Sequence, residues 1–296
     1  MIARRPVVIL PALMVVLGAC APQPASTPTP SAFPTSTIGP RAQATPWHQL
    51  PVLPAMTETA REIYNRGLEL GNNPAAFSKV GDCGSSPSWF LGAFDSGPDD
   101  YRLGEHQHLD EVIRYFGGSF GRVSLAAKSG FNASSVFSPL SADPVECAPG
   151  EGPLACEYRI HRPSIAFIML GTNDRFHAEV FEDRLSQIVA YTIAKGVVPI
   201  LATKPDNLEG DGSLNATVAR VARAYDVPLW NEWRAMQSLP DGGLQEDGAH
   251  LTWEPNWFDD RVILRAGWPV RNLTALQALD VVWRYVTSAE DPTATP

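Results

Sequence analysis

The chain has 296 residues, and its 32 acidic side chains outnumber the 23 Lys and Arg, which gives a formal net charge of −9. An acidic surface argues against nucleic acid and against anionic membrane as binding partners. Residues 47–287 show no internal repeat, and a stretch of that length suits a single α/β domain.

The first 19 residues predict an export signal. Arg4 and Arg5 precede an apolar run from Val7 to Leu17, which is too short for a membrane span of about 20 residues. Leu17-Gly18-Ala19-Cys20 resembles the lipobox of bacterial lipoproteins, in which the cysteine becomes the lipidated first residue. This resemblance implies an extracytoplasmic protein that is anchored to the bacterial membrane through Cys20. An ordinary secretory signal with a chance cysteine is the alternative.

The composition of the segment that begins at Cys20 predicts a flexible tether, and the composition of the last residues predicts a disordered tail. Residues 20–46 are rich in Pro, Thr, Ser and Ala, and residues 288–296 have a similar composition. Such segments cannot bury enough apolar surface to offset the entropy of ordering them. Removal of residues 1–19 takes away two arginines and no acidic residue, so the charge of the mature chain moves from −9 to −11.

Apolar patterns between the termini predict strands that alternate with helices. Helices are expected at 57–70, 105–116, 177–195, 213–225 and 273–286, and strands at 76–80, 122–127, 164–170, 197–202 and 227–230. The uninterrupted apolar run at 164–170 is typical of a strand that is covered on both faces. The alternation predicts an α/β fold with three layers, in which a mostly parallel five-stranded sheet lies between two layers of helices.

The cysteines that follow Cys20 divide into a pair and a single residue. Cys147 and Cys156 flank a short loop, and in an oxidising compartment they are expected to form a disulfide. Closing so short a loop stabilises the fold by roughly 2 to 3 kcal/mol on the chain-entropy model. Two unpaired thiols are the alternative. Cys83 is left without a partner, and an odd thiol outside the cytoplasm calls for an explanation.

Small and polar residues follow the predicted strands, at the edge where α/β sheets bind ligands. The segments are Gly81-Asp82-Cys83 after the first strand, Ser129-Gly130 after the second, Gly171-Thr172-Asn173-Asp174 after the third, and Asp247-Gly248-Ala249-His250 after the fifth. Together they resemble the motifs of the SGNH hydrolases, also called the GDSL esterase/lipase family. Cys83 stands where that family has its nucleophilic serine.

This resemblance spans residues 56–287 and implies a flavodoxin-like fold, ester hydrolysis, and no metal or organic cofactor. It implies a catalytic triad of Cys83, Asp247 and His250. It also implies an oxyanion hole that consists of the backbone N–H groups of Cys83 and Gly130 and the side chain of Asn173. Asp82 is expected to support the turn by hydrogen bonds.

The chemistry of these residue types fits acyl transfer, which needs a nucleophile, a base, a group that orients the base, and donors for the oxyanion. His250 would take the thiol proton, and Asp247 would hold the imidazole in the right tautomer. Ser86-Pro87 is typical of a helix start. A helix N-terminus beside Cys83, like a protonated His250, would lower the pKa of the thiol.

Three roles of Cys83 stay open: active nucleophile, buried thiol in a domain that has lost catalysis, and bystander to Ser85 or Ser86. The first predicts a surface-anchored esterase for a small acyl ester or glycan substrate. The second predicts a catalytically inactive binding lipoprotein of the cell envelope with the same fold. A redox-sensing lipoprotein is a third hypothesis.

Other aromatic and histidine residues have less specific interpretations. Trp253 and Trp257 follow the last motif closely, and either a pocket wall or a core position fits them. His106 and His108 lie two residues apart on a predicted helix, so their side chains should point apart. We expect them at a solvated surface, and no Cys or His spacing is typical of a zinc site.

Overall fold

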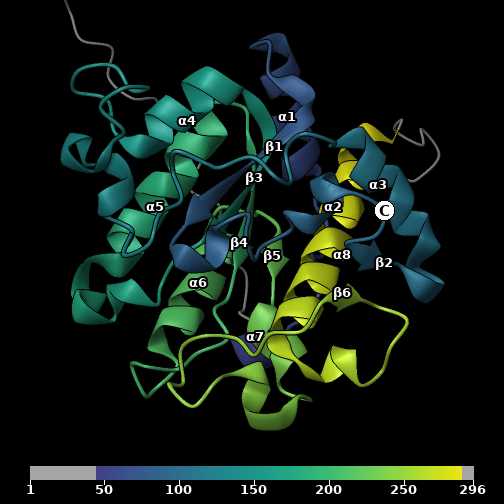
Figure 1. The fold of residues 1–296 in the computed structure, drawn as a ribbon. Helices are drawn as coiled ribbons and strands as arrows, with labels where there is room; N and C mark the ends of the chain where they lie inside the picture. The colour runs from purple at the N-terminus through teal and green to yellow at the C-terminus, as the bar shows by residue number, and fades with distance from the viewer. Residues whose placement is uncertain (1–44, 289–296) are drawn as a thin grey trace, which may run out of the picture. The chain divides into compact units, whose positions relative to one another are not determined.

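The computed structural model describes residues 45–288 (Figure 1). The predictions for the export signal, for Cys20, for the tether up to residue 44 and for residues 289–296 lie outside this range. Within it, the helices are too short or too polar to cross a membrane.

A parallel four-stranded sheet forms the centre of the domain (Figure 1), and its strand order is β1-β3-β4-β5. The strands are β1 (Asn73–Gly81), β3 (Pro163–Met169), β4 (Val198–Ala202) and β5 (Leu229–Trp230). Every residue of β3 and β4 is buried, because helices cover both faces of these strands. The predicted α/β fold is confirmed. A second, two-stranded parallel sheet joins β2 (Tyr101–Arg102) to β6 (Asn256–Trp257).

The segment 122–127 is not a strand, so the prediction of a five-stranded sheet is wrong by one strand. A single backbone bridge joins this segment to the end of β1. Side chains occupy the rest of that edge: Arg122 Nη2 donates to the Phe77 carbonyl at 3.0 Å, and Ser124 Oγ donates to the Lys79 carbonyl at 2.6 Å. Because these side chains take the acceptors of β1, the backbone of the segment cannot form a ladder with it.

Helices flank the sheet on both sides (Figure 1). α1 (Glu58–Glu69) packs against α8 (Gly267–Thr287) on one side, and α4 (Pro153–His161), α5 (Ala178–Ala194) and α6 (Ser213–Ala224) lie on the other. Residues 45–288 also form three shorter helices, α2 (Ala93–Ser96), α3 (Asp110–Tyr115) and α7 (Glu232–Met236). α8 begins six residues before the predicted start at Leu273 (273 − 267), because its Pro269 lies in the first turn, where helices tolerate proline.

Aromatic rings fix the position of β1 in the core. The ring of Phe77 is 5.0 Å from that of Phe120 and 5.9 Å from that of Phe167 on β3, between centroids. Both pairs have the edge-to-face geometry that aromatic rings favour. Phe77 is fully buried, so Phe77→Ala should cost about 3 to 5 kcal/mol of stability. β1 in turn positions the loop that carries Cys83.

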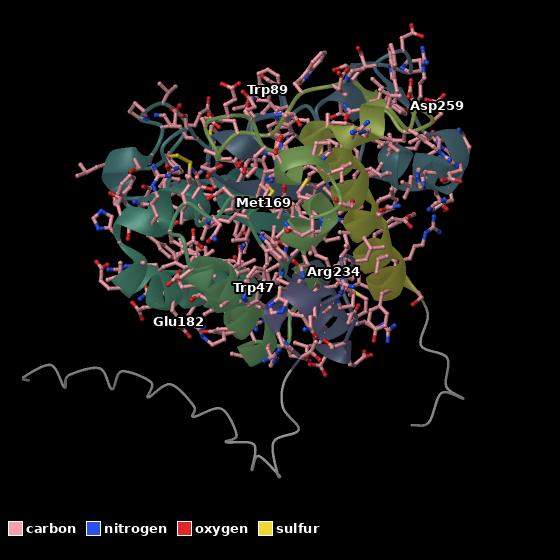
Figure 2. The ribbon with its side chains drawn as sticks, turned by 90° about the horizontal axis from the view of Figure 1, so that it is seen from below. Trp47, Trp89, Met169, Glu182, Arg234 and Asp259 are labelled. Atoms are coloured by element: carbon pink, nitrogen blue, oxygen red, sulfur yellow. A yellow bond between two sulfur atoms is a disulfide. The ribbon has the colours of Figure 1, made fainter. Side chains whose placement is uncertain are left out.

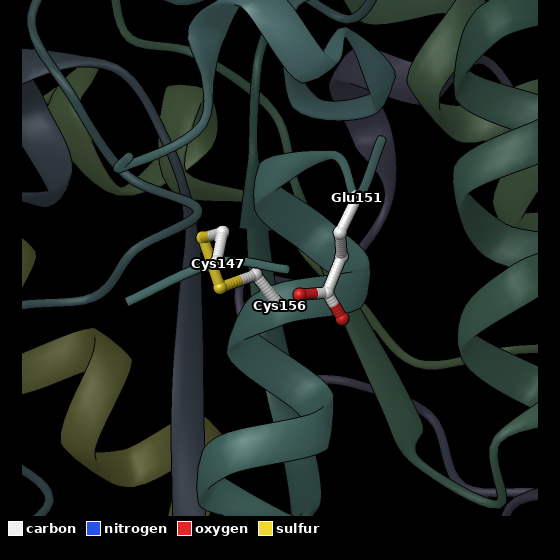
Figure 3. A group of neighbouring side chains, drawn as sticks. All are labelled: Cys147, Glu151 and Cys156. Atoms are coloured by element: carbon white, nitrogen blue, oxygen red, sulfur yellow. A yellow bond between two sulfur atoms is a disulfide. The ribbon is translucent and has the colours of Figure 1, made fainter. Parts of the chain in front are cut away.

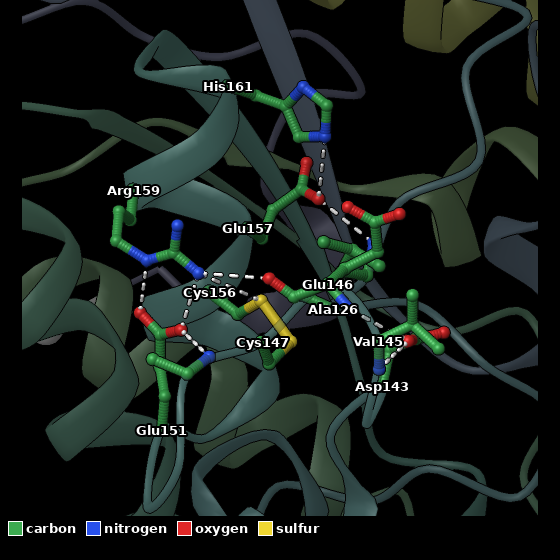
Figure 4. The surroundings of a disulfide bond; sticks show 12 residues. Ala126, Asp143, Val145, Glu146, Cys147, Glu151, Cys156, Glu157, Arg159 and His161 are labelled. Carbon is green, nitrogen blue, oxygen red and sulfur yellow. Dashed lines mark hydrogen bonds and ion pairs between the residues drawn. A yellow bond between two sulfur atoms is a disulfide. The ribbon is translucent and has the colours of Figure 1, made fainter.

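Cys147 and Cys156 are joined by a disulfide, as the sequence predicted (Figure 3). Arg159 closes the same loop, because its guanidinium donates to both carboxylate oxygens of Glu151 at 2.9 and 2.8 Å (Figure 4). The sulfurs and this carboxylate lie within 4.8 Å of one another. Since the sulfurs are bonded and the carboxylate is paired, the group offers no free thiolate to a metal. Cys83 is the free cysteine of residues 45–288.

Candidate active site

A cavity of about 500 Å³ lies at the carboxyl ends of the central strands. Four predicted site residues line it: Cys83 after β1, Asn173 after β3, and Asp247 and His250 from the loop before β6. The residues at the ends of parallel strands meet at one edge of a sheet. The structure therefore brings together side chains that are as much as 167 residues apart in the sequence (250 − 83).

Cys83 begins a short 3₁₀ helix, Cys83–Ser85, directly after β1. The Asp82 carboxylate accepts the N–H of Gly84 at 2.9 Å, so Asp82 supports this turn as expected. Burial raises the pKa of the Cys83 thiol, and the neighbouring Asp82 carboxylate raises it further. The thiol is therefore kept protonated more strongly than an ordinary cysteine.

The expectation that the pKa of Cys83 is lowered by a helix N-terminus is wrong. The chain makes a turn after Ser86, in which the Phe90 N–H donates to the Ser86 carbonyl at 2.8 Å. Leu91 then adopts a left-handed backbone conformation with φ of 64°, which ends the turn because L-residues disfavour that region. The next helix, α2, begins only at Ala93. The net effect of the surroundings on the thiol is a raised pKa.

The neighbouring serines do not face the cavity. Ser85 is fully buried, and its hydroxyl has no hydrogen-bond partner within residues 45–288. Ser86 is half-buried and lies outside the cavity lining. Of the three candidate nucleophiles, Cys83 is the one that lines the cavity.

His250 and Asp247 form a hydrogen-bonded pair at the rim of the cavity. The imidazole Nδ1 lies 2.6 Å from Asp247 Oδ2, and Asp247 Oδ1 accepts the N–H groups of Ala249 and His250, both at 3.0 Å. The hydrogen bond from the imidazole, followed by the two from the backbone, holds the pKa of Asp247 well below its usual range. A carboxylate that stays ionised beside Nδ1 favours the tautomer with the proton on that nitrogen.

A short hairpin holds this pair in place. Leu244 and Leu251 form an antiparallel bridge, and the Gln245 N–H donates to the His250 carbonyl at 2.7 Å. Leu251 is buried, and Thr252 donates through Oγ1 to the Gly243 carbonyl at 3.0 Å. The backbone of His250 is therefore fixed, while its side chain is exposed.

No hydrogen bond joins His250 to the Cys83 thiol in the part of the chain that the structure describes. Catalytic hydrogen bonds of unliganded sites are often long and shorten only when substrate binds. The exposed imidazole has room to turn about its side-chain bonds. Both groups line the same cavity, so proton transfer between them is assigned to the state with bound substrate.

Asn173 links the third motif to the second. Its Nδ2 donates one N–H to the Phe131 carbonyl at 2.9 Å, which leaves the second N–H of the amide available to the cavity. Gly130, the residue before Phe131, has a φ of 83°, a conformation that suits glycine. Gly130 is exposed and lies beside the cavity rather than in its lining. Asn173 thus lines the cavity, whereas Gly130, the glycine predicted for the oxyanion hole, lies outside the cavity lining.

The floor of the cavity contains charged groups that the sequence analysis missed. Arg271 on α8 pairs with Glu232 on α7, and its Nη2 donates to the Gly84 carbonyl at 3.3 Å. Lys204 pairs with Asp206 at 2.7 Å. Burial raises the pKa of Glu232 to about 7, while Arg271 opposes this rise. Glu232 and Lys204 follow strand ends, and this position was a signal that could have identified them.

Tryptophans form the wall of the cavity nearest to solvent. Trp253 is 60% exposed and lines the cavity. Of the two positions that the sequence allowed for Trp253, it therefore has the pocket wall and not the core. Trp89 is also exposed and lies at the edge of the molecule in Figure 2, whereas Met169 of β3 lies in the middle. Trp257 is half-buried, and the guanidinium of Arg102 lies 4.0 Å from its ring centroid.

The chain is similar in fold to several solved structures. A GDSL-like lipase from Bacteroides thetaiotaomicron is 14% identical, over 75% of this chain and 97% of that chain, with a TM-score of 0.44. The acetylxylan esterase Axe2 from Geobacillus stearothermophilus is 16% identical, over 70% and 95%, with a TM-score of 0.44. TesA is 16% identical, over 70% and 99%, with a TM-score of 0.42.

No family model matches the chain, and no curated protein matches it. The likeness to the solved structures is one of fold alone, and it assigns no role to any residue of this chain.

Proposed function

We propose that the protein hydrolyses carboxylic esters, with Cys83 as nucleophile, His250 as base and Asp247 as the group that orients the base. The observation that carries this proposal is that Cys83, Asn173 and the hydrogen-bonded pair of His250 and Asp247 line one cavity. The substrate class is a small acyl or acetyl ester. The amino acids of the site supply the whole chemistry.

The raised pKa of Cys83 decides how the reaction begins. Because the thiol is protonated, His250 must take its proton as Sγ attacks the ester carbonyl. The oxyanion that forms accepts hydrogen bonds from the Cys83 N–H and from Asn173 Nδ2, the two predicted donors whose residues line the cavity. The alcohol leaves with the proton from His250, and a thioester remains. Water then attacks the thioester carbonyl and gives its proton to His250. The C–S bond breaks, the acid is released, and His250 returns the proton to the Cys83 sulfur.

The same raised pKa favours a second function, in which the domain binds an acyl or glycan ligand without cleaving it. A half-buried, protonated thiol without a direct hydrogen bond to His250 would be inert if the imidazole never turned. This alternative keeps the cavity and its tryptophan wall and loses only the chemical step.

Hydrolysis of p-nitrophenyl acetate by the wild type, Cys83→Ala, Cys83→Ser and His250→Ala separates these functions. The esterase proposal expects turnover in the wild type and its loss in both alanine variants. His108→Ala is the matched control, since this exposed histidine lies outside the cavity. Turnover that survives Cys83→Ala would contradict Cys83 as nucleophile. An inactive wild type that gains activity as Cys83→Ser would support the binding function.

We also propose that the protein is lipidated at Cys20 and held at the outer side of the bacterial membrane. The support for this is the basic start, the apolar run and the small residues before Cys20. Metabolic labelling with palmitate in a bacterial host tests it. Label should be incorporated into the wild type and not into Cys20→Ser, and an unlabelled wild type would contradict the anchor.

A further inference from the structure

A second cavity, of about 470 Å³, adjoins the first along a shared tryptophan wall. The residues that line both cavities are Trp89, Trp253 and Trp268. Trp89 stacks on Trp268 with ring centroids 6.0 Å apart, while Trp89 is 48% exposed and Trp253 is 60% exposed. Apolar side chains that cluster on the surface of a soluble protein often mark a binding site. The three tryptophans therefore border both the cavity that Cys83 lines and the second cavity.

The second cavity is polar beyond this wall. Ser88, Ser96, Asp100, Glu254 and Asn256 contribute to its lining. No lysine or arginine is among the described residues that line it, whereas Asp100 and Glu254 are, so it offers no positive charge to a phosphate or a carboxylate. An acyl chain would desolvate these polar groups without bonding them, which is unfavourable. A neutral ligand with many hydroxyl groups satisfies both the polar groups and the aromatic wall.

Buried Asn272 holds this cavity in shape. Its Nδ2 donates to the Trp89 carbonyl and to Asn256 Oδ1, both at 2.9 Å, and its Oδ1 accepts the Leu91 N–H at 2.9 Å. This bond orients the Asn256 amide with its oxygen toward Asn272. The NH₂ group of Asn256 therefore points away from Asn272 and can donate to a ligand. One buried side chain thus fixes both the aromatic wall and a hydrogen-bonding group opposite it.

We propose that the tryptophan wall and the second cavity bind a neutral oligosaccharide, so that the ester cleaved at Cys83 is an O-acyl group of a sugar chain. The C–H faces of sugar rings pack on exposed tryptophan, and sugar hydroxyls bond carboxylate and amide groups. The cleavage step rests on the proposed function. In it, water and the acylated sugar give the free sugar hydroxyl and the carboxylic acid, with the hydroxyl protonated by His250.

Calorimetric titration of the purified protein with neutral hexasaccharides of glucose, xylose, mannose and N-acetylglucosamine tests the binding directly. At least one hexasaccharide should bind, and Trp253→Ala and Trp89→Ala should each raise its Kd by at least about tenfold. Phe176→Ala is the matched control, since this exposed aromatic residue lies outside both cavities. The Phe176→Ala variant should bind the hexasaccharide with the same Kd as the wild type.

Failure of this proposal can be told from failure of the esterase proposal, because the unacylated sugars need no chemical step. Hydrolysis of p-nitrophenyl acetate without binding of any hexasaccharide would overturn the sugar site and leave the esterase. Hexasaccharide binding that both tryptophan variants weaken, without ester hydrolysis, would support the sugar site alone. Binding that neither tryptophan variant weakens, or tighter binding of decanoate than of every hexasaccharide, would overturn it.

Discussion

Replacement of Asp247 by asparagine tests whether the imidazole of His250 is the base that activates the thiol. Asp247 Oδ1 accepts two backbone N–H groups, both at 3.0 Å, so the oxygen of an asparagine would stay at that position. Its Nδ2 would then face the imidazole Nδ1 in place of Oδ2, which is now 2.6 Å away. Because an amide N–H donates, His250 would carry its proton on Nε2 and could not take one from Cys83.

The expected loss in kcat for p-nitrophenyl acetate is about 10³-fold. The same replacement in a buried serine protease triad costs about 10⁴-fold through the wrong tautomer. The Asp247 side chain is 49% exposed. Water can therefore hydrogen-bond the imidazole in place of the carboxylate, so that some of the molecules keep the active tautomer and the loss in kcat is smaller. The fold should not suffer, because the asparagine keeps both backbone hydrogen bonds of the loop.

Steady-state kinetics on Asp247→Asn, with Asp259→Asn as the matched control, measures this loss. Asp259 is an exposed acid outside the cavity lining (Figure 2), so its variant should keep wild-type kcat. The double variant of Asp247→Asn and His250→Ala should be no slower than His250→Ala alone, because both changes remove one catalytic unit. If Asp247→Asn kept more than about a tenth of wild-type kcat, the tautomer argument would be refuted.

Three further predictions concern the thiol, a buried acid and the disulfide. Burial and Asp82 raise the pKa of the Cys83 thiol. Cys83 should therefore react with iodoacetamide at neutral pH more slowly than free cysteine, whose pKa is about 8.5. Mass spectrometry follows the labelling, and faster labelling of Cys83 would contradict the raised pKa. Burial raises the pKa of Asp174 from its ordinary 3.8 to about 6. Asp174 therefore contributes fully to stability below pH 3.8, and this contribution is lost as the pH rises through about 6. The wild type should therefore lose about 3 kcal/mol of unfolding free energy between these two pH values, and Asp174→Asn should not show this loss in urea unfolding. A variant with the pH profile of the wild type would contradict the assignment. The double variant Cys147→Ala and Cys156→Ala should lose about 2 to 3 kcal/mol of unfolding free energy, and a loss below about 0.5 kcal/mol would contradict the chain-entropy argument.

The sequence predicted the sheet and the residues at its edge because those features follow from local patterns. An uninterrupted apolar run such as 164–170 predicts a buried strand, and the first polar residues after parallel strands must lie near one another. Asn173 follows a strand end in this way, whereas His250 was identified through the resemblance of its segment to a family motif, and both residues line the cavity. The spacing of Asp247 and His250 also predicted their hydrogen bond.

The errors come from contacts that no local pattern contains. The segment 122–127 has the composition of a strand, but Ser124 and Arg122 bond the edge of β1 through their side chains. Arg271 lies in an apolar helix, and its role under the cavity depends on the meeting of α7 and α8. The pKa of Cys83 depends on burial by distant segments, which outweighs any nearby dipole.

The raised pKa of Cys83 also bears on how a free thiol persists in the oxidising compartment that we propose for this protein. Oxidation and disulfide exchange proceed through the thiolate, so a thiol that stays protonated reacts slowly with oxidants. The half-buried position of Cys83 lowers its accessibility as well. In such a site, the thiolate forms only when His250 is aligned with a bound ester, so the nucleophile is generated where the substrate is already present. A cysteine can then replace serine without the exposure to oxidation that an activated thiolate would bring.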